Sequence, residues 1–169
     1  MEKESIVGKA LQEQVQKLIA EEYFAYQLYF FSLAAVGGDE VGVVAELFAK
    51  IGEDELRDHL AQLAEWCRAY GVDVPASESE MKKAASKKLQ ALTSGLKKGQ
   101  PAGYYLDQAI AQEELAAESY KKALEGKDVC QFTDLQATLW HIYYDEVQHL
   151  RDLNTAKIAY EAGDDLVMC

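Results

Sequence analysis

Glu22-Tyr-Phe-Ala-Tyr-Gln-Leu-Tyr29 is repeated in the second half of the chain as Glu113-Glu-Leu-Ala-Ala-Glu-Ser-Tyr120, with Glu, Ala and Tyr at the same positions. In each half a second glutamate follows the first after 33 positions, and a histidine follows closely: Glu55 and His59, then Glu146 and His149. Such a duplicated set predicts two carboxylates and two carboxylate–imidazole pairs around a pair of metal ions in the middle of a four-helix bundle.

Four segments around these residues keep inward positions at spacings of three and four, as helices packed in a bundle do. We expect helices at about 6–36, 40–70, 102–126 and 131–162 in a single domain spanning 1–169. The long connection 71–101 predicts a crossover between the second and third helices. The fold class is therefore all-α, and each helix carries an ionisable residue on its inward seam, where an unpaired charge costs several kcal/mol.

The second helix departs from the repeat by one residue. Glu146 and His149 are three positions apart, whereas Glu55 and His59 are four apart, and the apolar positions downstream follow the phase of His59. A helix accommodates one extra residue as a π-bulge, so we predict one around Leu56 to Asp58. In the alternative, a regular helix, Asp58 would replace His59 as a ligand.

Carboxylates and imidazoles without thiolates suit iron or manganese. We expect Glu55 and Glu146 to bridge two metal ions, with four terminal ligands: Glu22 and His59 on one ion, Glu113 and His149 on the other. Tyr29 and Tyr120, seven residues after Glu22 and Glu113, would orient a ligand of a neighbouring helix by hydrogen bonding, supply an electron, or simply pack in the core. The third histidine, His141, lies four residues before Asp145 and is expected to be structural.

Composition narrows the function classes. A net charge of −12 argues against nucleic-acid binding, and the lysines between 80 and 98 are expected to form a solvated face. No stretch is long and apolar enough for a membrane span, and no apolar leader is evident at the N-terminus. Cys67, Cys130 and Cys169 form no Cys-x-x-Cys, so we expect free thiols, the first two buried, and a cytoplasmic location.

From about Ile6 to Tyr160 the chain resembles the ferritin-like di-iron superfamily. The segment beginning Glu22-Tyr-Phe-Ala-Tyr-Gln-Leu-Tyr-Phe looks like the first-helix ligand segment of bacterioferritins, and Asp145-Glu-Val-Gln-His-Leu resembles their fourth-helix segment. The resemblance assigns ligand roles to Glu22, Glu113, Glu146 and His149. The second-helix pair, Glu55 and His59, departs from the family pattern by the extra residue, with Asp58 as the substitute for His59.

The resemblance implies two iron ions per chain and a ferroxidase that oxidises Fe(II) with O2 or H2O2, with iron storage or detoxification. It also implies a homo-oligomer, in many relatives a hollow cage. Leu56 stands where bacterioferritins place a haem-ligating Met, so haem is not expected. Two alternatives stay open: a non-storing di-metal redox enzyme, such as a rubrerythrin-like peroxide reductase or oxidase, and a metal-free bundle serving as an assembly module.

Overall fold

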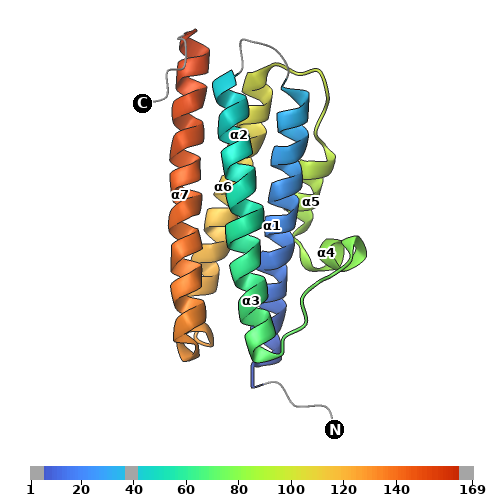
Figure 1. Cartoon of the computed structure of the whole chain (residues 1–169), viewed down its shortest axis with the longest axis vertical. Coiled ribbons are helices and arrows are strands. Elements are labelled where there is room, and N and C mark those ends of the chain that lie inside the picture. The colour runs from blue at the N-terminus through green and yellow to red at the C-terminus, as the bar shows by residue number, and fades with distance from the viewer. Residues whose placement is uncertain (1–5, 37–41, 164–169) are drawn as a thin grey trace.

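The computed structural model describes residues 6–36 and 42–163, and these residues form a bundle of long helices without strands (Figure 1). Two helical hairpins make the bundle. Their elements are α1 (Lys9–Ala35), α2 (Gly42–Asp54), η2 (Glu55–His59), α3 (Leu60–Tyr70), α6 (Ala102–Leu124) and α7 (Thr133–Ala162). Figure 1 shows α2, η2 and α3 as one continuous rod beside α1. The expected all-α four-helix bundle with a long crossover is thus confirmed.

The crossover carries two short helices, α4 (Glu78–Ala84) and α5 (Lys87–Ser94), which pack against α1. The sequence suggested one helical stretch here, but the backbone is extended at Ala85. The reason is local capping. Ser77 and Glu80 form a capping box at the start of α4, and the Ser86 side chain accepts a hydrogen bond from the backbone N–H of Leu89, which starts α5. The lysines of this segment are exposed, as expected of a solvated face.

The core consists of two apolar clusters separated by a polar layer. One cluster includes Leu11, Val15, Leu63, Trp66 and Leu139. The other lies nearer the opposite end of the bundle and includes Leu28, Phe48, Ile51, Leu106 and Leu153. Between them lie the buried glutamates and histidines. The apolar clusters fix the helix positions from both sides, so the polar layer is held in a rigid frame.

The ends of the helices follow familiar signals. Gly71 and Gly163 adopt left-handed φ values of 66° and 70° directly after α3 and α7, a conformation that only glycine adopts without strain. The helix expected from residue 6 begins at Lys9, and the expected start at 40 lies outside the described residues. None of the described helices is long and apolar enough to span a membrane.

One expectation about the cysteines is wrong. Cys67 is a buried free thiol, but Cys130 is a free thiol at the surface, in the short η3 turn (Val129–Gln131), where Val129 takes the inward position instead. Cys169 lies outside the described residues.

Candidate metal centre

Six ionisable side chains from four helices meet in the polar layer, and each is at most 4% exposed. They are Glu22 of α1, Glu55 and His59 of η2, Glu113 of α6, and Glu146 and His149 of α7. The structure therefore brings together all six residues that the sequence pattern singled out as ligands.

The six residues form two overlapping groups of four, each with ligand atoms within 4.8 Å of one another. Glu55 and Glu146 belong to both groups. Glu22 and His59 complete one, and Glu113 and His149 complete the other. The two imidazole rings stack with their centroids 5.8 Å apart. Two shared carboxylates with a terminal Glu and His at each end are the geometry of two adjacent metal positions bridged by carboxylates.

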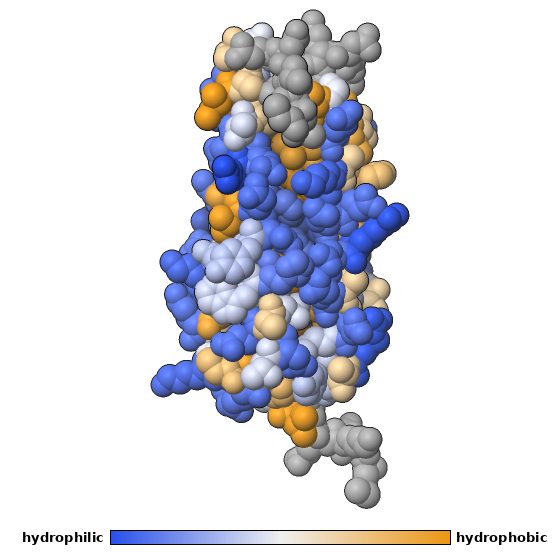
Figure 2. Space-filling view, turned by 60° about the vertical axis from the view of Figure 1, so that its left-hand side comes forward, coloured by the Kyte–Doolittle hydropathy of each residue, from blue (hydrophilic) through white to orange (hydrophobic). Residues whose placement is uncertain are grey.

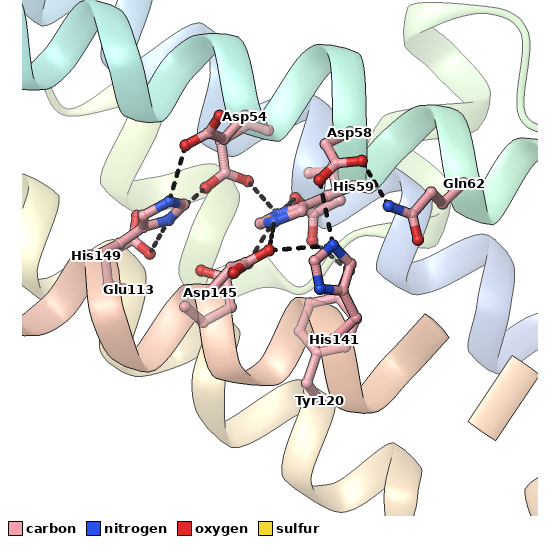
Figure 3. Close-up of polar contacts among 12 residues, drawn as sticks. Asp54, Asp58, His59, Gln62, Glu113, Tyr120, His141, Asp145 and His149 are labelled. Atoms are coloured by element: carbon pink, nitrogen blue, oxygen red, sulfur yellow. Dashed lines mark hydrogen bonds and ion pairs between the residues drawn. The ribbon is translucent and has the colours of Figure 1, made fainter. Parts of the chain in front are cut away.

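The predicted π-bulge is present and explains how Glu55 and His59 both face inward. Residues Glu55–His59 form a π-helical turn, and the N–H of Leu60 donates to the carbonyl of Glu55, five residues back. The extra residue rotates the helix after Glu55, so His59 is fully buried. Asp58 turns away from the buried group and contacts His141 and Gln62 instead (Figure 3). The alternative in which Asp58 takes the place of His59 finds no support in this geometry.

The atoms that face the centre lack hydrogen bonds. The Nδ1 atom of His59 lies 3.3 Å from Glu22 Oε2, 3.5 Å from Glu55 Oε2 and 3.3 Å from Glu146 Oε1. These contacts are too long or too poorly aligned for hydrogen bonding. Within the described part of the chain, eight buried atoms of the six residues have no hydrogen-bond partner: Glu22 Oε2, both oxygens of Glu55, His59 Nδ1, Glu113 Oε2, both oxygens of Glu146, and His149 Nδ1. Buried polar atoms left unpaired cost free energy, and metal ions would satisfy all eight.

Their surroundings favour the protonated form of the two shared carboxylates when the centre contains no metal. Burial, together with the charge of Glu22, raises the pKa of Glu55 to about 8. Burial and the neighbouring charges of Glu55 and Glu113 raise the pKa of Glu146 well above its usual value. The two terminal glutamates behave in the opposite way. Burial would raise the pKa of Glu22 and Glu113, but contacts with the shared glutamates, the facing imidazoles and the tyrosine hydroxyls lower it.

The histidines are held in their charged form by the same glutamates. Burial opposes an imidazolium, yet contacts with Glu146, Glu22 and Glu55 raise the pKa of His59. Contacts with Glu113 and Glu55 raise the pKa of His149 to about 10. Protons thus compensate the cluster of carboxylates in the absence of metal, and cations would compete with these protons for the same atoms.

Two tyrosines support the terminal glutamates across the bundle. The hydroxyl of Tyr29 donates a short hydrogen bond to Glu113 Oε1, and that of Tyr120 donates one to Glu22 Oε1. Each bond leaves the second oxygen of its glutamate, Oε2, facing a histidine of the centre without a hydrogen-bond partner among the described residues. Of the three roles left open for these tyrosines, hydrogen bonding to a ligand of another helix is therefore observed.

Two carboxylates that the sequence reading did not assign to the site orient the histidines from outside. Asp145 Oδ2 lies 3.4 Å from His59 Nε2, and Asp54 Oδ2 lies 3.3 Å from His149 Nε2 (Figure 3). An acidic partner on Nε2 holds a proton on that nitrogen, so Nδ1 is the nitrogen that would give up its proton to bind a metal. The signal was in the sequence, because an Asp directly precedes each shared glutamate, Glu55 and Glu146.

Comparison with solved structures shows that the chain has the ferritin-like fold. It superimposes on the dodecameric thioferritin, a bacterioferritin-related protein of Bacteroides fragilis, with a TM-score of 0.76 and 20% identity over 92% of this chain and 89% of that one. A ferritin-like di-iron carboxylate protein from Bacillus anthracis superimposes with a TM-score of 0.67 and 23% identity, over 88% of this chain and 96% of that one. A ferritin from M. penetrans superimposes with a TM-score of 0.72 and 18% identity, over 96% of this chain and 91% of that one. No family model and no curated protein matches the sequence.

The donor set fits two metal ions of the kind that bind oxygen and nitrogen. Four carboxylates and two imidazoles converge there, with no thiolate from the described residues, a combination suited to iron or manganese. The ferritin-like resemblance found in the sequence is thus confirmed at the level of the fold, and the buried Glu/His cluster fits a di-metal site.

Proposed function

We propose that this protein is a ferroxidase, which takes up Fe(II) in the buried Glu/His centre and oxidises it with O2 or H2O2. The observation that carries the proposal is the set of eight buried donor atoms without a hydrogen-bond partner among the described residues, arranged as two overlapping groups that share Glu55 and Glu146. In this proposal Glu22 with His59 and Glu113 with His149 are the terminal ligands. Filled with iron, the centre would supply one electron from each of two ions to the oxidant.

The residues of the chain would contribute positioning and proton transfer. Tyr29 and Tyr120 would hold the terminal glutamates in position through their hydroxyls, and either tyrosine could in addition supply an electron. The protons that Glu55 and the histidines give up on binding cations are available to the reduced oxidant. Asp145, a third exposed, touches the buried His59, and Asp54, 40% exposed, touches His149, so each aspartate connects the centre to the surface through a polar contact.

The proposal extends to iron storage or detoxification in a cytoplasmic homo-oligomer. A net charge of −12 favours accumulation of cations near the surface. Beside η2, an apolar groove between α1 and α2 is lined by Tyr26, Phe30, Leu33 and Leu56, with Phe30 62% exposed, which favours contact with a second copy. The Bacteroides fragilis protein of the same fold is described as dodecameric.

A second candidate is a di-metal redox enzyme without storage, such as a peroxide reductase or oxidase. It is favoured by the asymmetry of the centre, because the π-bulge is confined to the η2 half and α7 is regular at His149. A metal-free assembly module is disfavoured, since such a bundle would close its polar layer with hydrogen bonds, and these eight atoms have none.

Iron loading separates the candidates. Metal-free protein is loaded aerobically with a large excess of Fe(II), and the iron that co-elutes with it on size exclusion is quantified. A ferroxidase with storage retains far more than two iron ions per chain in a large particle, whereas retention near two in a small oligomer supports the redox enzyme. Glu113→Ala should abolish oxidation in either case. A Glu113→Ala variant with normal Fe(II) oxidation would contradict the proposed site.

A further inference from the structure

A second cluster of metal-binding side chains lies on the outside of the bundle, between η2 and α7. His141 Nε2 is 3.3 Å from Asp58 Oδ2 and 3.5 Å from Asp145 Oδ2. One ligand atom from each of the three residues lies within 4.8 Å of the others. Their side chains are 50%, 48% and 34% exposed, so a cation bound there would keep water molecules as further ligands. Figure 2 shows that this side of the molecule is mainly hydrophilic at mid-height.

The π-bulge builds this cluster, which we call the surface triad. The residue added to the helix turns His59 inward and, by the same rotation, directs Asp58 toward α7. Gln62 donates a hydrogen bond from Nε2 to Asp58 Oδ1, which leaves Oδ2 facing His141 (Figure 3). Asp58 is therefore oriented by its own helix rather than swinging freely in solvent.

The surface triad is joined to the buried centre through one carboxylate. Asp145 Oδ2 contacts His141 Nε2 on one side and His59 Nε2 on the other, at 3.5 and 3.4 Å. The opposite ring nitrogen of His59, Nδ1, faces three glutamates of the buried centre. The two metal-binding groups are thus separated by a single imidazole.

The other half of the repeat lacks such a cluster. The position four residues before Asp54, which corresponds to His141, is Lys50, and the position before His149, which corresponds to Asp58, is Gln148. A lysine ammonium has no lone pair for a metal ion. The surface triad is therefore a feature of one half only, and its counterpart supplies matched control positions.

We propose that Asp58, His141 and Asp145 form a solvent-accessible site for a divalent first-row transition-metal cation, from which Fe(II) passes to the buried centre. One imidazole and two carboxylates are ligands suited to Fe(II), Mn(II) or Zn(II). Binding at the surface triad stands on its own geometry, and only the delivery of Fe(II) rests on the proposed ferroxidase function.

Zinc tests the binding directly, because it needs no oxidation chemistry. Crystals of the full chain are soaked in Zn(II), and anomalous diffraction locates the ions in the native protein, in His141→Ala and in the control Lys50→Ala. We expect a zinc ion at the surface triad of the native protein and of Lys50→Ala, and its loss in His141→Ala with the buried ions retained. Zinc in the buried centre alone would overturn the surface site. Zinc at the surface triad alone would support it and contradict the di-metal centre.

Fe(II) oxidation at limiting iron tests the delivery role. His141→Ala should oxidise the same total Fe(II) per chain as the native protein, with an initial rate several-fold lower, and Lys50→Ala should match the native rate. Since His141 is half-exposed, its removal leaves the core intact, and circular dichroism checks the fold. Equal initial rates in His141→Ala and the native protein would overturn the delivery role while leaving the zinc result to stand.

Discussion

Metal binding at the buried centre should release protons, because in the metal-free protein the donor atoms are occupied by them. The pKa of Glu55 is about 8 and that of His149 about 10, so at pH 7 Glu55 is about nine-tenths protonated and His149 almost fully so. The pKa of Glu146 and of His59 is raised as well. Filling both positions at pH 7 therefore displaces the protons of Glu55 and His149, on the order of two per chain, and the raised pKa values of Glu146 and His59 add to this release.

The release has a definite pH dependence. A metal ion must compete with each bound proton, so the affinity falls about tenfold per proton for each pH unit below the pKa of the group concerned. At pH 9 Glu55 has already lost its proton, since its pKa is about 8, and the release drops by about one proton compared with pH 7. Below pH 7 the affinity for both ions together should decline steeply.

The assay is a Zn(II) titration of metal-free protein in weakly buffered solution with a pH indicator, at pH 7 and pH 9. Calorimetry in two buffers of different ionisation enthalpy gives an independent count of protons. His141→Ala serves as the reference, because it removes any contribution of the surface triad and leaves the buried centre untouched. Stoichiometric zinc binding without proton release, or with equal release at both pH values, would refute the assignment of protons to these atoms.

Three further predictions concern stability, the supporting carboxylates and the bulge. The metal-free chain should lose stability as pH rises from 4.5 to 8, because the folded protein holds Glu55 protonated and the unfolded chain does not; a thermal midpoint that rises over this window would contradict it. Asp145→Asn and Asp54→Asn should each weaken zinc binding roughly 10- to 100-fold, measured by competition with a chelator, and unchanged affinity in both would remove their orienting role. Deleting Arg57, an exposed residue of the π-helical turn, should restore a regular helix and preserve zinc binding at the buried centre. Deleting Gln148 from the regular helix α7 should abolish zinc binding. Loss of zinc binding in both deletion variants would show that the bulge is required.

The bundle and its polar layer could be predicted because both leave periodic traces in the sequence. The equal spacing of Glu22 and Glu55 and of their counterparts in the second half predicts that the four glutamates lie at the same level of the bundle. The apolar positions after Glu55 predict one extra residue in that helix. The π-helical turn follows from that shift, since a regular helix would have placed Asp58 inward. Periodicity therefore predicted both which faces are buried and where the helix is irregular.

The contacts outside the seam could not be predicted in the same way. Exposed positions carry no periodic constraint, so the meeting of Asp58 with His141, 83 residues apart, depends on how η2 and α7 pack. His141 was expected to be structural, but it is half-exposed and lies between two carboxylates. The break between α4 and α5 also depends on local capping by Ser86 rather than on any periodic pattern.

The proposed oxidation of iron in the buried Glu/His cluster can be tested by adding Fe(II) stepwise to metal-free protein under air. The rapid oxidation is followed by absorbance, for the native chain and for Glu113→Ala. We expect the rapid phase to end at two Fe(II) per chain in the native protein and to be missing in the variant. A rapid phase without a stoichiometric end point, or one that persists in Glu113→Ala, would contradict the claim.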